Sequence, residues 1–130
     1  MRRRFTIMGA LFAALLALSA PPARANEKFI VFFQSELTDL DSAAEDVVPA
    51  AIANARQNPA MPVEITGFAS TDGDEKANQQ LSLARAQKIS AMIAAASIAP
   101  GRLRSIGKGE VKSVGTAEEA RRVEVVVRAP

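Results

Sequence analysis

The sequence contains no cysteine, histidine, tryptophan or tyrosine. Without cysteine the chain has neither disulfides nor thiol chemistry, so its fold depends on packing alone. Without histidine it lacks the commonest general base and the commonest metal ligand. Ser70 and Ser82 therefore have no histidine to activate them, and no S-x-x-K dyad replaces it. The composition favours a binding module over an enzyme.

A long apolar run occurs only at the start of the chain. Residues 1–25 combine a cluster of arginines, an apolar run and an A-x-A cleavage pattern, at positions 2–4, 7–18 and 23–25. This combination predicts a secretory signal peptide, and a signal anchor that stays attached is the alternative. The run is short for spanning a bilayer. We therefore expect one mature domain of residues 26–130 in the periplasm, with no transmembrane segment after signal cleavage.

The basic character of the whole chain comes from this leader. Four of the 16 basic residues and none of the 14 acidic ones lie in residues 1–25, which leaves 12 bases against 14 acids. The mature chain thus has a net charge of −2. A nucleic-acid partner has no electrostatic support.

Hydrophobic patterning predicts alternating strands and helices along the mature chain. Strands are expected at 28–33, 61–68, 103–107 and 122–128. Helices are expected from about 41 to 57, with a kink or split at Pro49, and at 78–96, with a helical turn at 118–120. Residues 108–117 are expected to form a loop. The order β-α-β-α-β-β predicts an α+β or α/β sandwich of one sheet with helices packed on it.

Arg85 is the most unusual residue of the second helix. A helical wheel places it and Asn78 inside the apolar stripe of residues 78–96. A guanidinium is always charged and is costly to bury without an acceptor. Arg85 therefore faces an anion, which belongs either to a ligand or to one of the acids of this chain (Asp72, Asp74 or Glu110).

Two other groups of polar residues are candidates for a site. In the loop 70–74, Asp72 or Asp74 is expected to cap the following helix. A calcium loop is the alternative there, but Lys76 occupies the third ligand position, so we expect no metal and no cofactor. At the head of the last strand, Arg121 and Arg122 point to opposite faces, so at most one of them can lie beside Arg85.

Residues 67–86 resemble the signature of the OmpA-like peptidoglycan-binding domain. The family pattern G-[HY]-T-D-x-x-G-x-x-x-x-N-x-x-L-S-x-x-R-A aligns from Gly67 to Ala86 without a gap. Residues 102–110 (RLRSIGKGE) are similar to the family's R-[IL]-x-x-x-G-x-G-E, and residues 121–124 to its R-R-V-E. The resemblance covers essentially all of residues 28–128.

This resemblance implies an α+β fold with one mixed sheet and helices on one side. It also implies non-covalent binding of peptidoglycan through the diaminopimelate of the stem peptide. In the family an Arg and an Asp hold the carboxylate and amine ends of that ligand. By position, Arg85 matches this Arg, Asn78 the Asn of the motif, and Arg122 a second anion-binding Arg. The expected ligand-binding residues are Arg85, Asn78, Ser70, Asp72, Thr71 and Arg122.

The sequence departs from the family pattern at Ser70, which occupies the position of the ligand-binding Asp. A hydroxyl cannot supply the negative charge that pairs with an ammonium group, and losing such a bond costs about 1.5–3 kcal/mol. Asp72 is the candidate substitute. The alternative is a divergent domain that has lost wall binding, acts as a structural or protein-interaction module in the envelope, and satisfies Arg85 internally.

Overall fold

The structure, a computed structural model, describes residues 25–34, 40, 44–70, 73–111 and 116–129. Residues 1–24 of the predicted signal peptide and most of the predicted helix cap at 38–41 lie outside these ranges. The elements are β1 (Lys28–Phe32), α1 (Ala44–Gln57), β2 (Val63–Ala69), α2 (Glu75–Ala95), a 3₁₀ turn (Pro100–Arg102), β3 (Leu103–Glu110), α3 (Ala117–Ala120) and β4 (Arg122–Val127).

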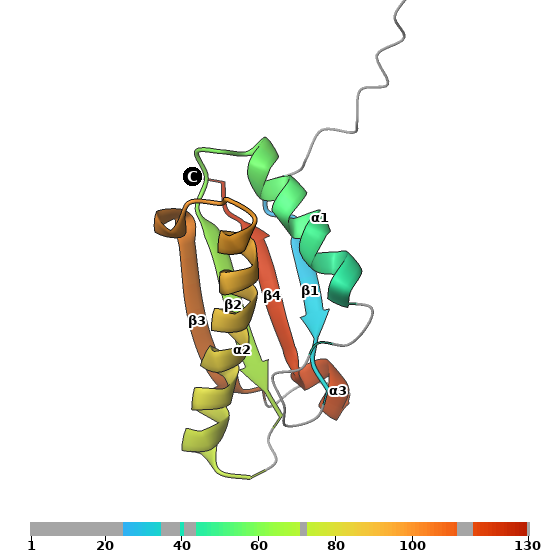
Figure 1. The fold of residues 1–130 in the computed structure, drawn as a ribbon. Coiled ribbons are helices and arrows are strands. Elements are labelled where there is room, and N and C mark those ends of the chain that lie inside the picture. The colour runs from blue at the N-terminus through green and yellow to red at the C-terminus, as the bar shows by residue number, and fades with distance from the viewer. Residues whose placement is uncertain (1–24, 35–39, 41–43, 71–72, 112–115, 130) are drawn as a thin grey trace, which may run out of the picture.

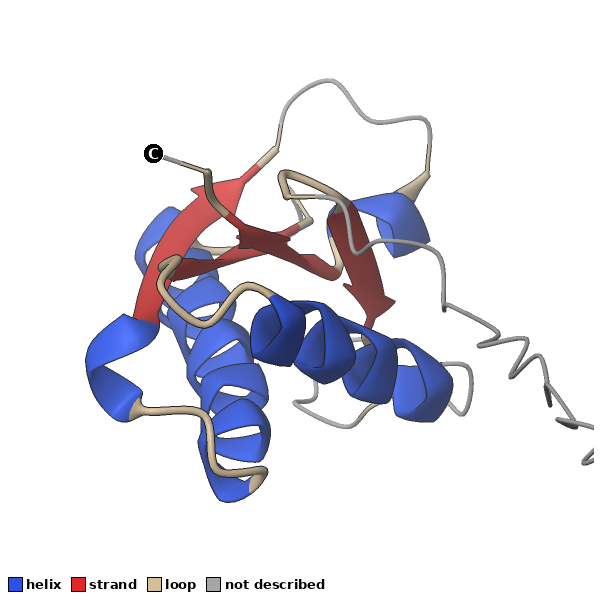
Figure 2. Ribbon diagram, turned by 90° about the horizontal axis from the view of Figure 1, so that it is seen from above, coloured by secondary structure: helices blue, strands red, loops and turns tan. Residues whose placement is uncertain are grey.

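The four strands form one mixed sheet in the order β1-β4-β2-β3. β4 is antiparallel to both β1 and β2, whereas β2 and β3 are parallel. The two long helices α1 and α2 lie on the same side of the sheet (Figures 1 and 2). This arrangement confirms the expected α+β fold with helices on one side.

The strand directions bring several chain segments to one end of the sheet. Because β1, β2 and β3 run in the same direction and β4 runs against them, the first three strands finish where β4 begins. α2 also begins at this end, at the bottom of Figure 1. We call it the loop end of the sheet.

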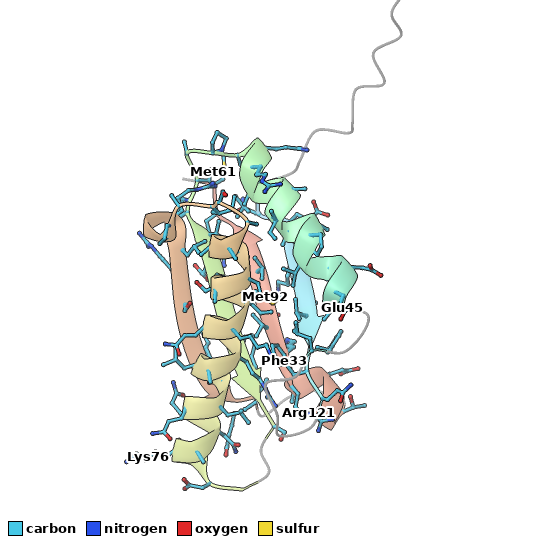
Figure 3. The ribbon with its side chains drawn as sticks, in the orientation of Figure 1. Phe33, Glu45, Met61, Lys76, Met92 and Arg121 are labelled. Atoms are coloured by element: carbon cyan, nitrogen blue, oxygen red, sulfur yellow. The ribbon has the colours of Figure 1, made fainter. Side chains whose placement is uncertain are left out.

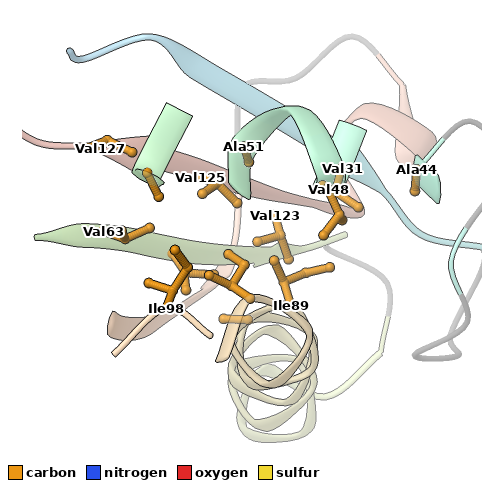
Figure 4. Close-up of a cluster of buried hydrophobic side chains, with 14 of the residues drawn as sticks. Val31, Ala44, Val48, Ala51, Val63, Ile89, Ile98, Val123, Val125 and Val127 are labelled. Carbon is orange, nitrogen blue, oxygen red and sulfur yellow. The ribbon is translucent and has the colours of Figure 1, made fainter. Parts of the chain in front are cut away.

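The hydrophobic core lies between the sheet and the two long helices (Figure 4). Alternate valines of β4 point into it, as the period-2 pattern of the sequence predicts. They pack with buried residues of β2 and α2, and the fully buried members include Val123, Val125, Val127, Val63, Ile65, Ile89 and Ile93. Neither long helix covers the opposite face, where Ile30, Phe32 and Ile106 are more than a third exposed.

Two glycines allow α2 to lie unusually close to the sheet. A Cβ atom at Gly67 of β2 would lie 1.9 Å from the carbonyl oxygen of Ser82, and one at Gly107 of β3 would lie 2.7 Å from Leu83. Both contacts are with the body of α2, which cannot move aside without losing its packing. The first glycine of the motif and Gly107 are therefore required by the approach of this helix.

At the end of the sheet opposite the loop end, Arg102 links the start of β3 to the end of α1. Its guanidinium donates hydrogen bonds to the carbonyl oxygens of Met61, Ala55 and Asn58, at 2.8–3.0 Å. These acceptors belong to the end of α1 and to the segment that leads into β2. The arginine that opens the family-like motif of residues 102–110 thus has a structural role within this chain.

The predicted end of β3 is wrong, α2 begins at Glu75 instead of residue 78, and α1 has no split at Pro49, whereas a kink there stays a prediction. β3 continues to Glu110 instead of ending at 107, because Gly107 and Gly109 serve the packing of α2 and do not break the strand. α1 is a single helix through Pro49 and is not split there. A proline at this position removes only one helical hydrogen bond, and its ring is exposed.

Candidate ligand-binding site

Arg85 is fully buried in the middle of α2, as the helical wheel predicted. Its Nη1 atom donates a hydrogen bond of 3.3 Å to the carbonyl oxygen of Phe68, near the end of β2. Its guanidinium also lies 5.5 Å from the ring centroid of Phe33, the residue that follows β1. The cation is therefore held at the loop end of the sheet by β1, β2 and α2.

A second arginine reinforces the positive charge at this place. Burial lowers the pKa of Arg85 to about 10, and the charge of Arg121 acts in the same direction. Arg85 is still protonated at neutral pH. Arg121 has a buried Nε atom with no hydrogen-bond partner among the described residues. Figure 3 shows Phe33 and Arg121 at the loop end. Two cations at one place favour the binding of an anion.

The register of β4 separates Arg121 from Arg122. Arg121 is two residues before Val123 and so shares the helix-covered face with Arg85. Arg122 points to the uncovered face, where its guanidinium lies 4.2 Å from the ring centroid of Phe68 and pairs with Glu124 at 3.2 Å. The structure therefore does not bring Arg122 to the side of the sheet that holds Arg85.

On the side of the site away from Arg121, Asn78 of α2 contacts the end of β3. Only 8% of Asn78 is exposed, and its Nδ2 atom donates a hydrogen bond of 3.1 Å to Oε1 of Glu110. One turn further, the hydroxyl of Ser82 accepts a 2.8 Å hydrogen bond from the backbone N–H of Gly109. Gln79 donates to the carbonyl oxygen of Gly107. These contacts attach the first half of α2 to β3.

The loop between β2 and α2 is described only in part. Ser70 follows β2 directly and is half-buried, whereas Thr71 and Asp72 lie outside the described residues. Asp74 caps α2 by accepting a hydrogen bond of 3.0 Å from the backbone N–H of Ala77, and Glu75 lies in the first turn. The expected capping role of Asp74 is therefore confirmed.

Neither a metal cluster nor a membrane-spanning helix is present in the part of the chain that the structure describes. Within it, no three or more Asp or Glu side chains are grouped so as to hold a metal ion. No helix there has the length and apolarity needed to cross a membrane.

Sequence reasoning missed three features of this site. It did not assign Phe33 or Ser82 to it, because an aromatic residue at a strand end and a serine in a helix are both common elsewhere. It left the choice between Arg121 and Arg122 to the resemblance. The alternation with Val123 was the available signal, since it places Arg121 on the core side of β4.

The described elements define a small α+β domain with a buried arginine at the loop end of its sheet. A sequence model of the OmpA family matches residues 32–125, and the chain belongs to this family. No curated protein matches the sequence closely enough to count as a relative.

Several solved structures share the fold. The peptidoglycan-associated lipoprotein from Burkholderia pseudomallei is 14% identical, with a TM-score of 0.67 over 75% of this chain and 87% of that one. The OmpA-like domain of FopA1 from Francisella tularensis subsp. tularensis SCHU S4 is 20% identical, with a TM-score of 0.69 over 79% and 72%. The cell wall anchor of the T6SS from Pseudomonas aeruginosa is 22% identical, with a TM-score of 0.62 over 79% and 82%.

Proposed function

We propose that this domain binds peptidoglycan non-covalently in the periplasm and holds a carboxylate of diaminopimelate on Arg85. The observation that carries the proposal is the fully buried guanidinium of Arg85 beside a second cation, Arg121. Membership of the OmpA family supports it. So do two fold neighbours, one named as peptidoglycan-associated and one as a cell wall anchor.

Each site residue receives a role from its chemistry. Arg85 offers a planar fork of hydrogen-bond donors. This fork fits the two oxygens of a carboxylate better than the ammonium group of a lysine would. We assign to Arg121 the role of the second anion-binding arginine. Arg122 instead packs on the ring of Phe68, and the carbonyl oxygen of Phe68 orients Arg85. Asn78, Ser70, Thr71 and Asp72 are proposed as polar contacts around the ligand.

The second candidate function is that of a structural or protein-interaction module in the envelope, in a domain that has lost wall binding. The observation that favours it is Ser70, which lacks the negative charge that the family pattern has at this position. Under this alternative the arginine pair would serve only the fold or a protein partner.

A titration followed by ¹⁵N amide chemical shifts distinguishes the two functions. The ligand is a soluble muropeptide that contains diaminopimelate, added to the chain from residue 26 onward, which includes every described helix and strand. We expect shifts at 68–70, at the first half of α2 and at Arg121. Arg85→Lys should weaken binding about tenfold or more, because the fork is lost.

The matched control is Arg104→Lys, since Arg104 is exposed and lies on β3. It should leave the affinity unchanged. Shifts confined to the uncovered face of the sheet, or no shifts at any muropeptide concentration, would contradict the proposal.

A further inference from the structure

Glu110 differs from the other carboxylates of the sheet. Glu64 pairs with Arg128 at 3.2 Å, and Glu124 pairs with Arg122 at 3.2 Å. Glu110 is half-buried but forms no ion pair among the described residues. One of its oxygens accepts the hydrogen bond from Asn78, and the other has no partner among those residues. A partly desolvated carboxylate in this state attracts a cation from outside the chain.

Glu110 lies at the loop end of the sheet. It is the last residue of β3 and is paired in register with Ala69, the residue before Ser70. Asn78, which holds it, lies two turns from Arg85 on the same face of α2, about 10 Å along the helix axis. The side chain of Arg85 leans toward Asn78, because helix side chains point to the N-terminus.

The loop end therefore has a negative side and a positive side. Glu110 supplies a carboxylate at the end of β3, and Arg85 with Arg121 supplies cations near the end of β2 and the start of β4. A ligand that carries both an ammonium group and a carboxylate matches this distribution of charge. A ligand with carboxylates alone matches only the positive side and would be repelled by Glu110.

We propose that Glu110 binds the ammonium group of the ligand and supplies the negative charge that Ser70 does not. The inference rests on the proposed function, since it concerns the same site. Asn78 acts in this arrangement as a positioning residue, because its hydrogen bond holds the carboxylate toward α2. Glu110 is thus the residue that selects a zwitterionic ligand over a simple dicarboxylate.

A pair of small probes tests this selection. meso-Diaminopimelic acid and pimelic acid have the same carbon chain and both carboxylates, but only the first has amines. We expect the wild-type chain to bind diaminopimelic acid about tenfold or more tightly than pimelic acid, as measured by calorimetry. In Glu110→Gln the amide oxygen still accepts from Asn78, but the charge is lost, so this ratio should fall to about one.

Glu64→Gln is the control, because it makes the same change on the uncovered face of β2, and it should preserve the ratio. If the wild-type chain discriminates and Glu110→Gln discriminates equally, the ammonium contact lies elsewhere and the inference is wrong, while the proposed function stands. If the wild-type chain binds both probes equally, the inference is also wrong. If it binds neither the probes nor muropeptide, the proposed function fails with it.

Discussion

At the scale of single residues, the site depends on a cation that the fold holds at a cost. Arg85 is fully buried, and the neighbouring charge of Arg121 disfavours its protonated form. Removing a guanidinium from water beside another cation opposes folding, so such an arrangement is typical of a functional site. A bound anion would relieve both effects.

The pH dependence of binding follows from the pKa of Arg85. An anion stabilises the protonated form, and the free domain loses this proton as the pH rises through about 10. The chain has no histidine, so no side chain of that type titrates near neutrality. We expect the affinity for pimelic acid, which has no amine, to be constant from about pH 6 to 9 and to fall above about pH 10. A change in affinity between pH 6 and 8, measured by calorimetry, would contradict this account.

Individual residues were predictable to different degrees. The helical wheel predicted the burial of Arg85 and Asn78, because a period of 3.6 fixes the face of a long helix, and both are confirmed. The same kind of reasoning could have selected Arg121 over Arg122 as the neighbour of Arg85. The contact between Asn78 and Glu110 was not predictable, because it joins residues 32 positions apart in the chain.

At the scale of elements, the glycines of β2 and β3 determine where α2 lies. Gly67→Ala would place a methyl group 1.9 Å from the carbonyl oxygen of Ser82, inside the backbone of the helix. We expect a loss of about 3 kcal/mol in the free energy of unfolding, measured with denaturant, together with weaker muropeptide binding because α2 carries Arg85.

Gly101→Ala is the control for this substitution. A Cβ atom at Gly101 would have no neighbour within 4 Å, so the expected change is within about 0.5 kcal/mol. If both substitutions cost the same, the close approach of α2 to β2 does not limit stability.

The lengths of elements were less predictable than their existence. The sequence predicted every strand and both long helices, but it ended β3 too early because glycine is usually read as a strand breaker. In this chain Gly107 and Gly109 are close to α2, and the strand continues through them to Glu110. This extension matters for function because it brings Glu110 beside Ala69 at the loop end.

At the scale of the whole molecule, the topology gathers the site from segments distant in the chain. The pattern of strands and helices predicted one sheet with helices packed on it, and the family resemblance implied that they lie on one side; both are confirmed. It could not predict the order β1-β4-β2-β3, because alternation fixes which face a residue occupies but not which strand is its neighbour. The insertion of β4 between β1 and β2 is what brings Arg121 to Arg85.

The central claim is that this domain binds the cell wall through Arg85. The most direct test is co-sedimentation of the chain from residue 26 onward with purified sacculi that contain diaminopimelate. We expect the wild-type chain and Arg104→Lys to pellet, and Arg85→Lys, shown to be folded by thermal denaturation, to remain in solution. If the wild-type chain remains in solution and Ser70→Asp pellets, the domain has the shape of a wall-binding site without the function, and the claim is wrong.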